Sequence, residues 1–127
     1  MQNSEIYQAA LGLLAETDEN AALGDYEDRA PYILALFCNE AEELDGKYRT
    51  ANKMPSSPEY SPLMLSFSED FPLCDAFASA AVYYLASMLV FEENPEMSDK
   101  LFEKYTSRMT DIYSTLPAEN EKIKNVY

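Results

Sequence analysis

The stretch AFASAAVYYLASMLVF, residues Ala76–Phe91, has no charged side chain, although the whole chain carries 23 acidic and 9 basic residues. This stretch is shorter than the ~20 apolar residues of a membrane-spanning helix, and it contains serines and tyrosines. It therefore predicts a buried helix that is apolar on every side. Such a helix is either wrapped by the other helices of its own chain or covered in part by another subunit, and the sequence leaves both explanations open.

The composition predicts one domain spanning residues 1–127, because 47% of the residues are hydrophobic and the length suits a single core. The formal net charge is −14. A surface this acidic argues against specific nucleic-acid binding and against docking on an anionic membrane, since both depend on basic residues.

Cys38 and Cys74 both lie among apolar residues and lack CxxC spacing. We expect them to be small core residues in a reducing compartment, with a single disulfide as the alternative. The opening residues MQNSEIYQAALGLL have neither a basic segment nor a long apolar one. They predict no secretory signal, so we expect the protein in the cytoplasm.

Three more segments have a helical period. The first runs from Ser4 to about residue 14, with Asn3 or Ser4 as its cap. The second is predicted to begin at Asp28, which places Pro31 in the first turn; a start near residue 25 would require a kink at that proline. Its apolar stripe consists of Ala30, Leu34, Phe37, Ala41, Leu44 and Tyr48. The last begins at Asn94 and Pro95, continues through Met97, Leu101, Tyr105, Met109, Ile112 and Leu116, and ends at Pro117. We expect it to form an antiparallel hairpin with the uncharged helix.

Residues 49–72 lack this period and contain four prolines. Within them LMLSFS could form one short strand or hairpin, whose open edge would be available to another molecule. The expected fold is therefore a mainly all-α, small four-helix bundle with a long irregular insertion, followed by a tail of about residues 117–127. The candidate interface residues are Leu63, Leu65, Phe67, Tyr83, Ile123, Val126 and Tyr127.

The residue types exclude much catalytic chemistry. The chain has no histidine, which removes histidine-dependent triads and histidine metal sites, and its three glycines form no phosphate-binding loop. We expect no catalytic residue and no cofactor. One alternative is a Mg²⁺ site resembling that of all-helical nucleotide pyrophosphohydrolases, in which paired acids face one another across two helices. Its ligands would be Glu40, Glu43, Glu96 and Asp99, although acids at this spacing arise easily by chance in so acidic a chain.

The segments DYEDRAPYILALFCNEAEEL and PLCDAFASAAVYYLASMLVFEENPEMSDKLFEKYTSRM resemble the head–tail connector (adaptor) proteins of tailed bacteriophages and prophages. The resemblance implies a non-enzymatic subunit that joins a ring between the portal and the tail. Its partners would be further copies of itself, the portal and the tail-completion proteins, with DNA only as passing cargo. The protein would be found in the bacterial cytoplasm during assembly and then at the head–tail junction of the virion. A second alternative is an acidic regulatory module that mimics DNA and binds a basic partner.

Overall fold

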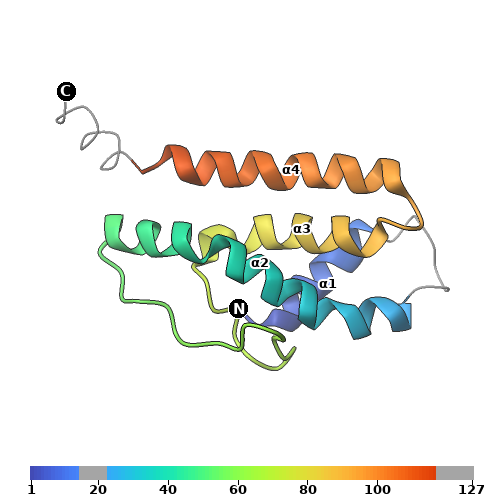
Figure 1. Cartoon of the computed structure of the whole chain (residues 1–127), viewed down its shortest axis with the longest axis horizontal. Coiled ribbons are helices and arrows are strands. Elements are labelled where there is room, and N and C mark those ends of the chain that lie inside the picture. The colour runs from blue at the N-terminus through green and yellow to red at the C-terminus, as the bar shows by residue number, and fades with distance from the viewer. Residues whose placement is uncertain (15–22, 117–127) are drawn as a thin grey trace.

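The computed structural model describes residues 1–14 and 23–116, which form a mainly all-α bundle without a strand in these ranges (Figure 1). Four α-helices and one 3₁₀ turn make up the regular structure. Their bounds are Asn3–Leu13 (α1), Leu23–Ala51 (α2), Asp75–Phe77 (the 3₁₀ turn), Ala78–Val90 (α3) and Pro95–Ser114 (α4). The predicted four-helix architecture is confirmed. None of the described helices is both long and apolar enough to cross a membrane.

The uncharged helix α3 lies at the centre of the bundle. It packs against α1, α2 and α4, and none of its residues is fully exposed. Figure 1 shows α3 between α2 and α4, with α1 crossing behind it. Of the two explanations offered by the sequence, wrapping by the chain's own helices therefore accounts for its apolar surface.

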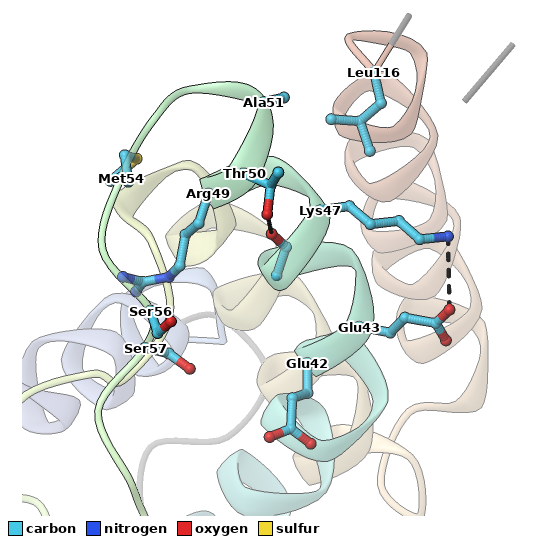
Figure 2. A pocket seen from close by; sticks show the side chains of 11 residues that line it. Glu42, Glu43, Lys47, Arg49, Thr50, Ala51, Met54, Ser56, Ser57 and Leu116 are labelled. Atoms are coloured by element: carbon cyan, nitrogen blue, oxygen red, sulfur yellow. Dashed lines mark hydrogen bonds and ion pairs between the residues drawn. The ribbon is translucent and has the colours of Figure 1, made fainter. Parts of the chain in front are cut away.

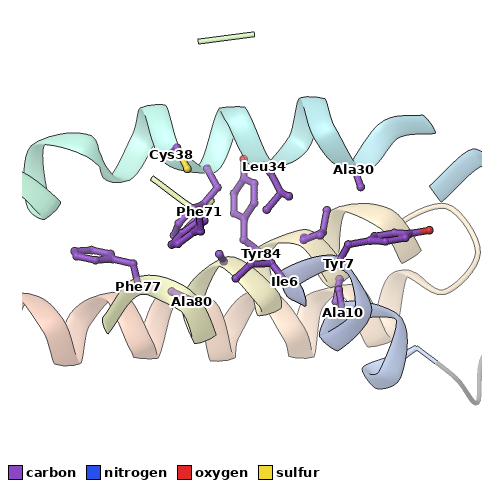
Figure 3. Close-up of a cluster of buried hydrophobic side chains, with 14 of the residues drawn as sticks. Ile6, Tyr7, Ala10, Ala30, Leu34, Cys38, Phe71, Phe77, Ala80 and Tyr84 are labelled. Carbon is purple, nitrogen blue, oxygen red and sulfur yellow. The ribbon is translucent and has the colours of Figure 1, made fainter. Parts of the chain in front are cut away.

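The core is a layer of apolar and aromatic side chains between α2 and α3, closed at one end by α1 (Figure 3). Phe37 is at its centre, where its ring lies 5.6 Å from that of Tyr84 and 6.3 Å from that of Phe71. Cys38 and Cys74 are both free and buried.

Helices α3 and α4 form the predicted antiparallel hairpin, and a pair of buried serines joins them. Each hydroxyl donates a hydrogen bond of 2.9 Å to the main-chain carbonyl of the other residue, Ser87 to Ser98 and Ser98 to Ser87. The small side chains let the two helices approach closely. The start of α4 is as predicted, because the Asn94 side chain accepts a hydrogen bond from the N–H of Met97 and Pro95 occupies the first position.

The predicted start of the second helix is wrong. Helix α2 begins at Leu23, so Pro31 lies in its interior and not in its first turn. Proline lacks an N–H, and the carbonyl of Glu27 therefore loses its usual helical partner. The proline carbonyl is used from outside the helix, because it accepts a hydrogen bond of 3.1 Å from the N–H of Leu65.

The irregular insertion covers residues 52–74, because α2 continues to Ala51. Lys53 follows with a φ of 55°, a left-handed conformation that often terminates helices. The short strand considered for LMLSFS does not form, and the only β-type pairing in the described residues is an isolated bridge between Gln2 and Asp70. The insertion instead caps α1, since the N–H groups of Asn3 and Ser4 donate to its carbonyls.

The cap of α1 also differs from the prediction. Gln2 is the N-cap residue, and its N–H donates to the carboxylate of Glu5 at 2.9 Å. Asn3, one of the two predicted caps, instead has its side-chain amide bonded to the carbonyl of Ser66. The Asn3 side chain is therefore used in a contact with the insertion and does not cap the helix as the local sequence pattern had predicted.

A buried ion pair holds the end of the insertion against α2. Asp45 is 1% exposed, and its carboxylate accepts hydrogen bonds from the N–H of Cys74 at 2.9 Å and from Nε of Arg49 at 2.8 Å. The same guanidinium donates to the carbonyls of Pro55 and Pro72. One acid and one base thus fix both ends of a segment that has no regular structure of its own.

We expect Asp45→Ala to lower the free energy of unfolding by about 3 kcal/mol, because it leaves a largely buried guanidinium and a buried N–H without their partner. Glu43→Ala is the matched control on the same helix, where an exposed pair with Lys47 is removed, and its cost should stay within about 0.5 kcal/mol. Urea denaturation followed by circular dichroism measures both. Equal losses in the two variants would show that the buried pair does not hold the insertion.

Candidate interaction surfaces

The four acids of the possible Mg²⁺ site do not come together. Glu40 and Glu43 lie on α2, while Glu96 and Asp99 lie in the first turn and a half of α4. Glu43 pairs with Lys47 at 3.6 Å, and Glu96 pairs with Lys100 at 3.8 Å. In residues 1–14 and 23–116, no group of three or more cysteine, aspartate and glutamate side chains is placed to hold a metal ion.

The most conspicuous surface feature is a group of four large apolar side chains on the outward side of α2 and on the insertion beside it. We call this group the outer patch. Its members and their exposed fractions are Tyr32 (55%), Leu36 (55%), Leu63 (75%) and Met64 (43%). Exposed apolar side chains that are grouped in this way are typical of interaction surfaces, whereas single ones are common on any protein.

Two hydrogen bonds place the insertion along α2 at this point. The side-chain amide of Asn39 donates to the carbonyl of Pro62 at 2.8 Å, and the N–H of Leu65 donates to the carbonyl of Pro31. Eight helical residues rise about 12 Å, and three extended residues span about 10 Å, so the segment 62–65 runs back along the same stretch of helix. Ala35 in this stretch of α2 is fully buried, whereas Leu63 and Met64 of the segment are exposed.

The sequence singled out only one member of the outer patch, Leu63. Tyr32 and Leu36 follow two residues after Ala30 and Leu34 of the apolar stripe, which places them about 200° around the helix, on the opposite face. The positions of Tyr32 and Leu36 on that face could therefore have been predicted from the helical period. The position of Met64 could not have been predicted, because it depends on the path of the insertion.

The other predicted interface residues have different positions. Leu65 is 2% exposed and belongs to the core, so it is not available to a partner. Phe67 is partly buried and stacks on Tyr7 with ring centroids 4.9 Å apart. Tyr83 is partly buried on α3 and packs against the core. The remaining three, Ile123, Val126 and Tyr127, lie outside the described residues.

A second surface feature is a groove between α2 and α4. Its volume is about 320 Å³, and the residues that line it are Leu44, Tyr105, Thr106, Met109, Thr110 and Tyr113. It forms because α2 and α4 both pack mainly on α3 and much less on each other. At the end of the bundle where α2 and α4 terminate lies a wider depression of about 780 Å³, bordered by the last turns of α2, residues 54–57 and Leu116 (Figure 2).

Burial, together with a carboxylate on α2, raises the pKa of two tyrosines near the groove. Burial raises the pKa of Tyr84 to about 12, and the charge of Glu40, the neighbouring Tyr105 and a hydrogen bond to Glu40 add to the effect. Burial and Glu40 also raise the pKa of Tyr105. Elsewhere, burial raises the pKa of the Cys38 thiol to about 12, with smaller effects from Asp45 and Glu42. The folded protein therefore holds the protons of these three groups more tightly than an unfolded chain would.

No protein-family model matches the chain, and neither a curated protein nor a solved structure is significantly similar to it.

The raised pKa values predict that stability falls at alkaline pH. In the unfolded chain the Cys38 thiol loses its proton near its ordinary pKa of 9.0, but in the folded protein it keeps the proton until about pH 12. Unfolding therefore releases protons above pH 9, and rising pH favours the unfolded state. We expect the free energy of unfolding to drop between pH 8 and pH 10.5. The drop should be smaller in Cys38→Ala, measured by urea denaturation at both pH values; an equal drop would contradict the assignment to this thiol.

Proposed function

We propose that the protein is a non-enzymatic structural subunit of a phage or prophage head–tail connector, and that it assembles as a ring between portal and tail. The observation that carries this proposal is the outer patch, which exposes four large apolar side chains on an otherwise acidic protein. The resemblance of the sequence to connector proteins and the all-α bundle agree with it. The hydrolase alternative has no comparable support, because the acids it requires do not form a cluster in the described residues.

The outer patch suits a contact between neighbouring copies of the chain. Two proteins with a net charge of −14 repel each other over most of their surfaces, and a contact through uncharged side chains avoids placing carboxylates opposite one another. In a ring the contact is heterologous, so the outer patch of one copy meets a different surface of the next. The patch would then be buried in the subunit interface of the ring. This would explain why its side chains are exposed in the isolated subunit.

The acidic character also fits this function. A ring that surrounds passing DNA benefits from an inner wall that repels phosphates, because contacts with basic residues would retain the DNA. The chain supplies 23 acids for such a wall. A high-resolution structure of the assembled ring should show carboxylates facing the channel, and a basic channel would contradict this part of the proposal.

The decisive experiment mixes the purified protein with the portal protein of the same phage or prophage and examines the product by cryo-electron microscopy. We expect a ring of this subunit on the portal, and we expect Leu63→Lys to reduce ring formation at least about tenfold, because it places a charge in an apolar contact. Ser107→Lys, an equal charge change at an exposed position of α4, is the control and should assemble normally.

Two results would overturn the proposal. One is a failure to bind the portal, together with binding of a basic nucleic-acid-binding protein that is lost at high salt, as an acidic regulatory module would behave. The other is Mg²⁺-dependent nucleotide hydrolysis by the purified protein.

A further inference from the structure

We infer that the groove between α2 and α4 binds the proline-containing segment 54–64 of a second copy of the chain. This segment has the sequence MPSSPEYSPLM and ends in two members of the outer patch, Leu63 and Met64. The inference rests on the proposed function and deepens it, because it names the surface of one copy that meets the outer-patch side of the next. It is supported by the chemistry of the segment and the groove, by their lengths, and by their positions on opposite flanks of α2.

The segment is exposed and irregular. Pro55, Pro58 and Pro62 are all exposed, and residues 54–61 contain no helix, strand or turn. Figure 1 shows the segment, in green, as an open loop that leaves the end of α2. Pro55 and Pro58 form a PxxP pattern, which favours the extended polyproline II conformation. Segments of this kind are recognised by grooves that are lined with aromatic side chains.

The groove has this chemistry. Its walls include the rings of Tyr105 and Tyr113, beside the apolar side chains of Leu44 and Met109. Aromatic rings pack on proline rings, and hydroxyl groups such as those of Thr110 and Tyr113 can donate hydrogen bonds to the carbonyls of an extended chain. Tyr113 is 52% exposed, so a bound segment would remove much of its ring from water.

Both surfaces are nearly free of charge, in a chain whose net charge is −14. None of the residues that line the groove is charged, and Glu59 is the only charged residue of the segment. Two copies of so acidic a chain repel each other over most of their surfaces. The contact between the segment and the lining of the groove contains a single carboxylate, that of Glu59, which keeps the repulsion small.

The lengths of the segment and the groove agree. A polyproline II helix rises about 3.1 Å per residue, so a PxxP repeat spans about 9 Å. Tyr105 and Tyr113 are separated by eight residues of α4, or about 12 Å. The repeat therefore fits between the two tyrosines. The groove has a volume of about 320 Å³, and a cavity of about 150 Å³ already holds a molecule of benzene, so there is room for two proline rings.

The segment is held away from the groove of its own chain. Arg49 donates a hydrogen bond to the carbonyl of Pro55, and Asn39 on the same helix donates to that of Pro62. Leu44 in the groove is five residues from Asn39 and five from Arg49, which places it about 140° around α2 from each of them. The segment and the groove therefore lie on opposite flanks of α2. This is the arrangement of a heterologous contact, in which each copy offers its segment to one neighbour and its groove to the other.

A synthetic peptide of residues 54–64, added to the full-length protein, tests the inference. We expect NMR chemical-shift changes at the methyl groups of Leu44 and Met109. A control peptide with alanine in place of its prolines should bind at least about fivefold more weakly, because it lacks both the rings and the extended preference. Tyr113→Ser should weaken binding of the native peptide at least about fivefold, and its NMR spectrum also reports whether the variant is folded. Tyr32→Ser, at a similarly exposed tyrosine outside the groove, should leave the affinity unchanged.

Disulfide cross-linking tests the same contact between whole chains. One preparation carries Glu59→Cys in the segment, and a second carries Thr106→Cys in the groove, while the native cysteines stay buried. The control for the second preparation is Lys104→Cys, whose thiol lies about 200° around α4 from position 106. Under mild oxidation we expect mixed dimers to form at least about tenfold faster with Thr106→Cys than with Lys104→Cys, measured by mass spectrometry.

Several outcomes would overturn the inference. They are an absence of shifts in the groove at millimolar peptide, shifts that map to the outer patch instead, and equal cross-linking rates at positions 106 and 104. Dimers of two Glu59→Cys chains as the main product would also overturn it, in favour of a symmetric contact. If a ring forms on the portal but the groove does not bind the peptide, the inference fails and the proposed function stands. If the peptide binds but no ring forms, the proposed function fails alone.

Discussion

The structure depends on the buried pair of Asp45 and Arg49. The long insertion has no regular secondary structure, so its path is set by its contacts with the helices. The Asp45 carboxylate accepts a hydrogen bond from the N–H of Cys74, and the Arg49 guanidinium donates to the carbonyls of Pro55 and Pro72. A buried ion pair adds little stability when compared with apolar packing, but it is costly to break. It therefore acts here to select one path for the insertion.

That path shapes the rest of the molecule. Once the ends of the insertion are fixed, its middle lies along α2 and caps the first turn of α1, where Asn3 and Ser4 donate to its carbonyls. Helix α1 is thus positioned against α3 partly by a segment without secondary structure. The uncharged helix α3 can be covered on every side only because this arrangement brings α1 to the face that α2 and α4 leave open.

Much of the fold was predictable from the sequence because its signals are local. The period of the apolar residues indicated the helices, and Asn94 with Pro95 marked the start of α4 correctly. Pro31 misled the prediction, since a proline usually marks the first turn of a helix, whereas here α2 continues through it. The strand considered around Leu65 does not form for a related reason: the N–H of Leu65 bonds to the carbonyl of that same proline and not to another strand. Both errors concern main-chain groups whose partners are distant in the sequence.

The candidate surfaces depend on the same long-range contacts. Half of the outer patch, Tyr32 and Leu36, follows from helical phase alone, but Leu63 and Met64 join it only because the insertion is bonded to α2 at Asn39 and Pro31. The patch is therefore not a property of one helix, and its formation is linked to the buried pair that holds both ends of the insertion. Any change that releases the insertion would separate the two halves of the patch and would also withdraw Leu65, Phe71 and Leu73 from the core. For the connector subunit that we propose, this linkage would make the contact surface dependent on correct folding of the insertion.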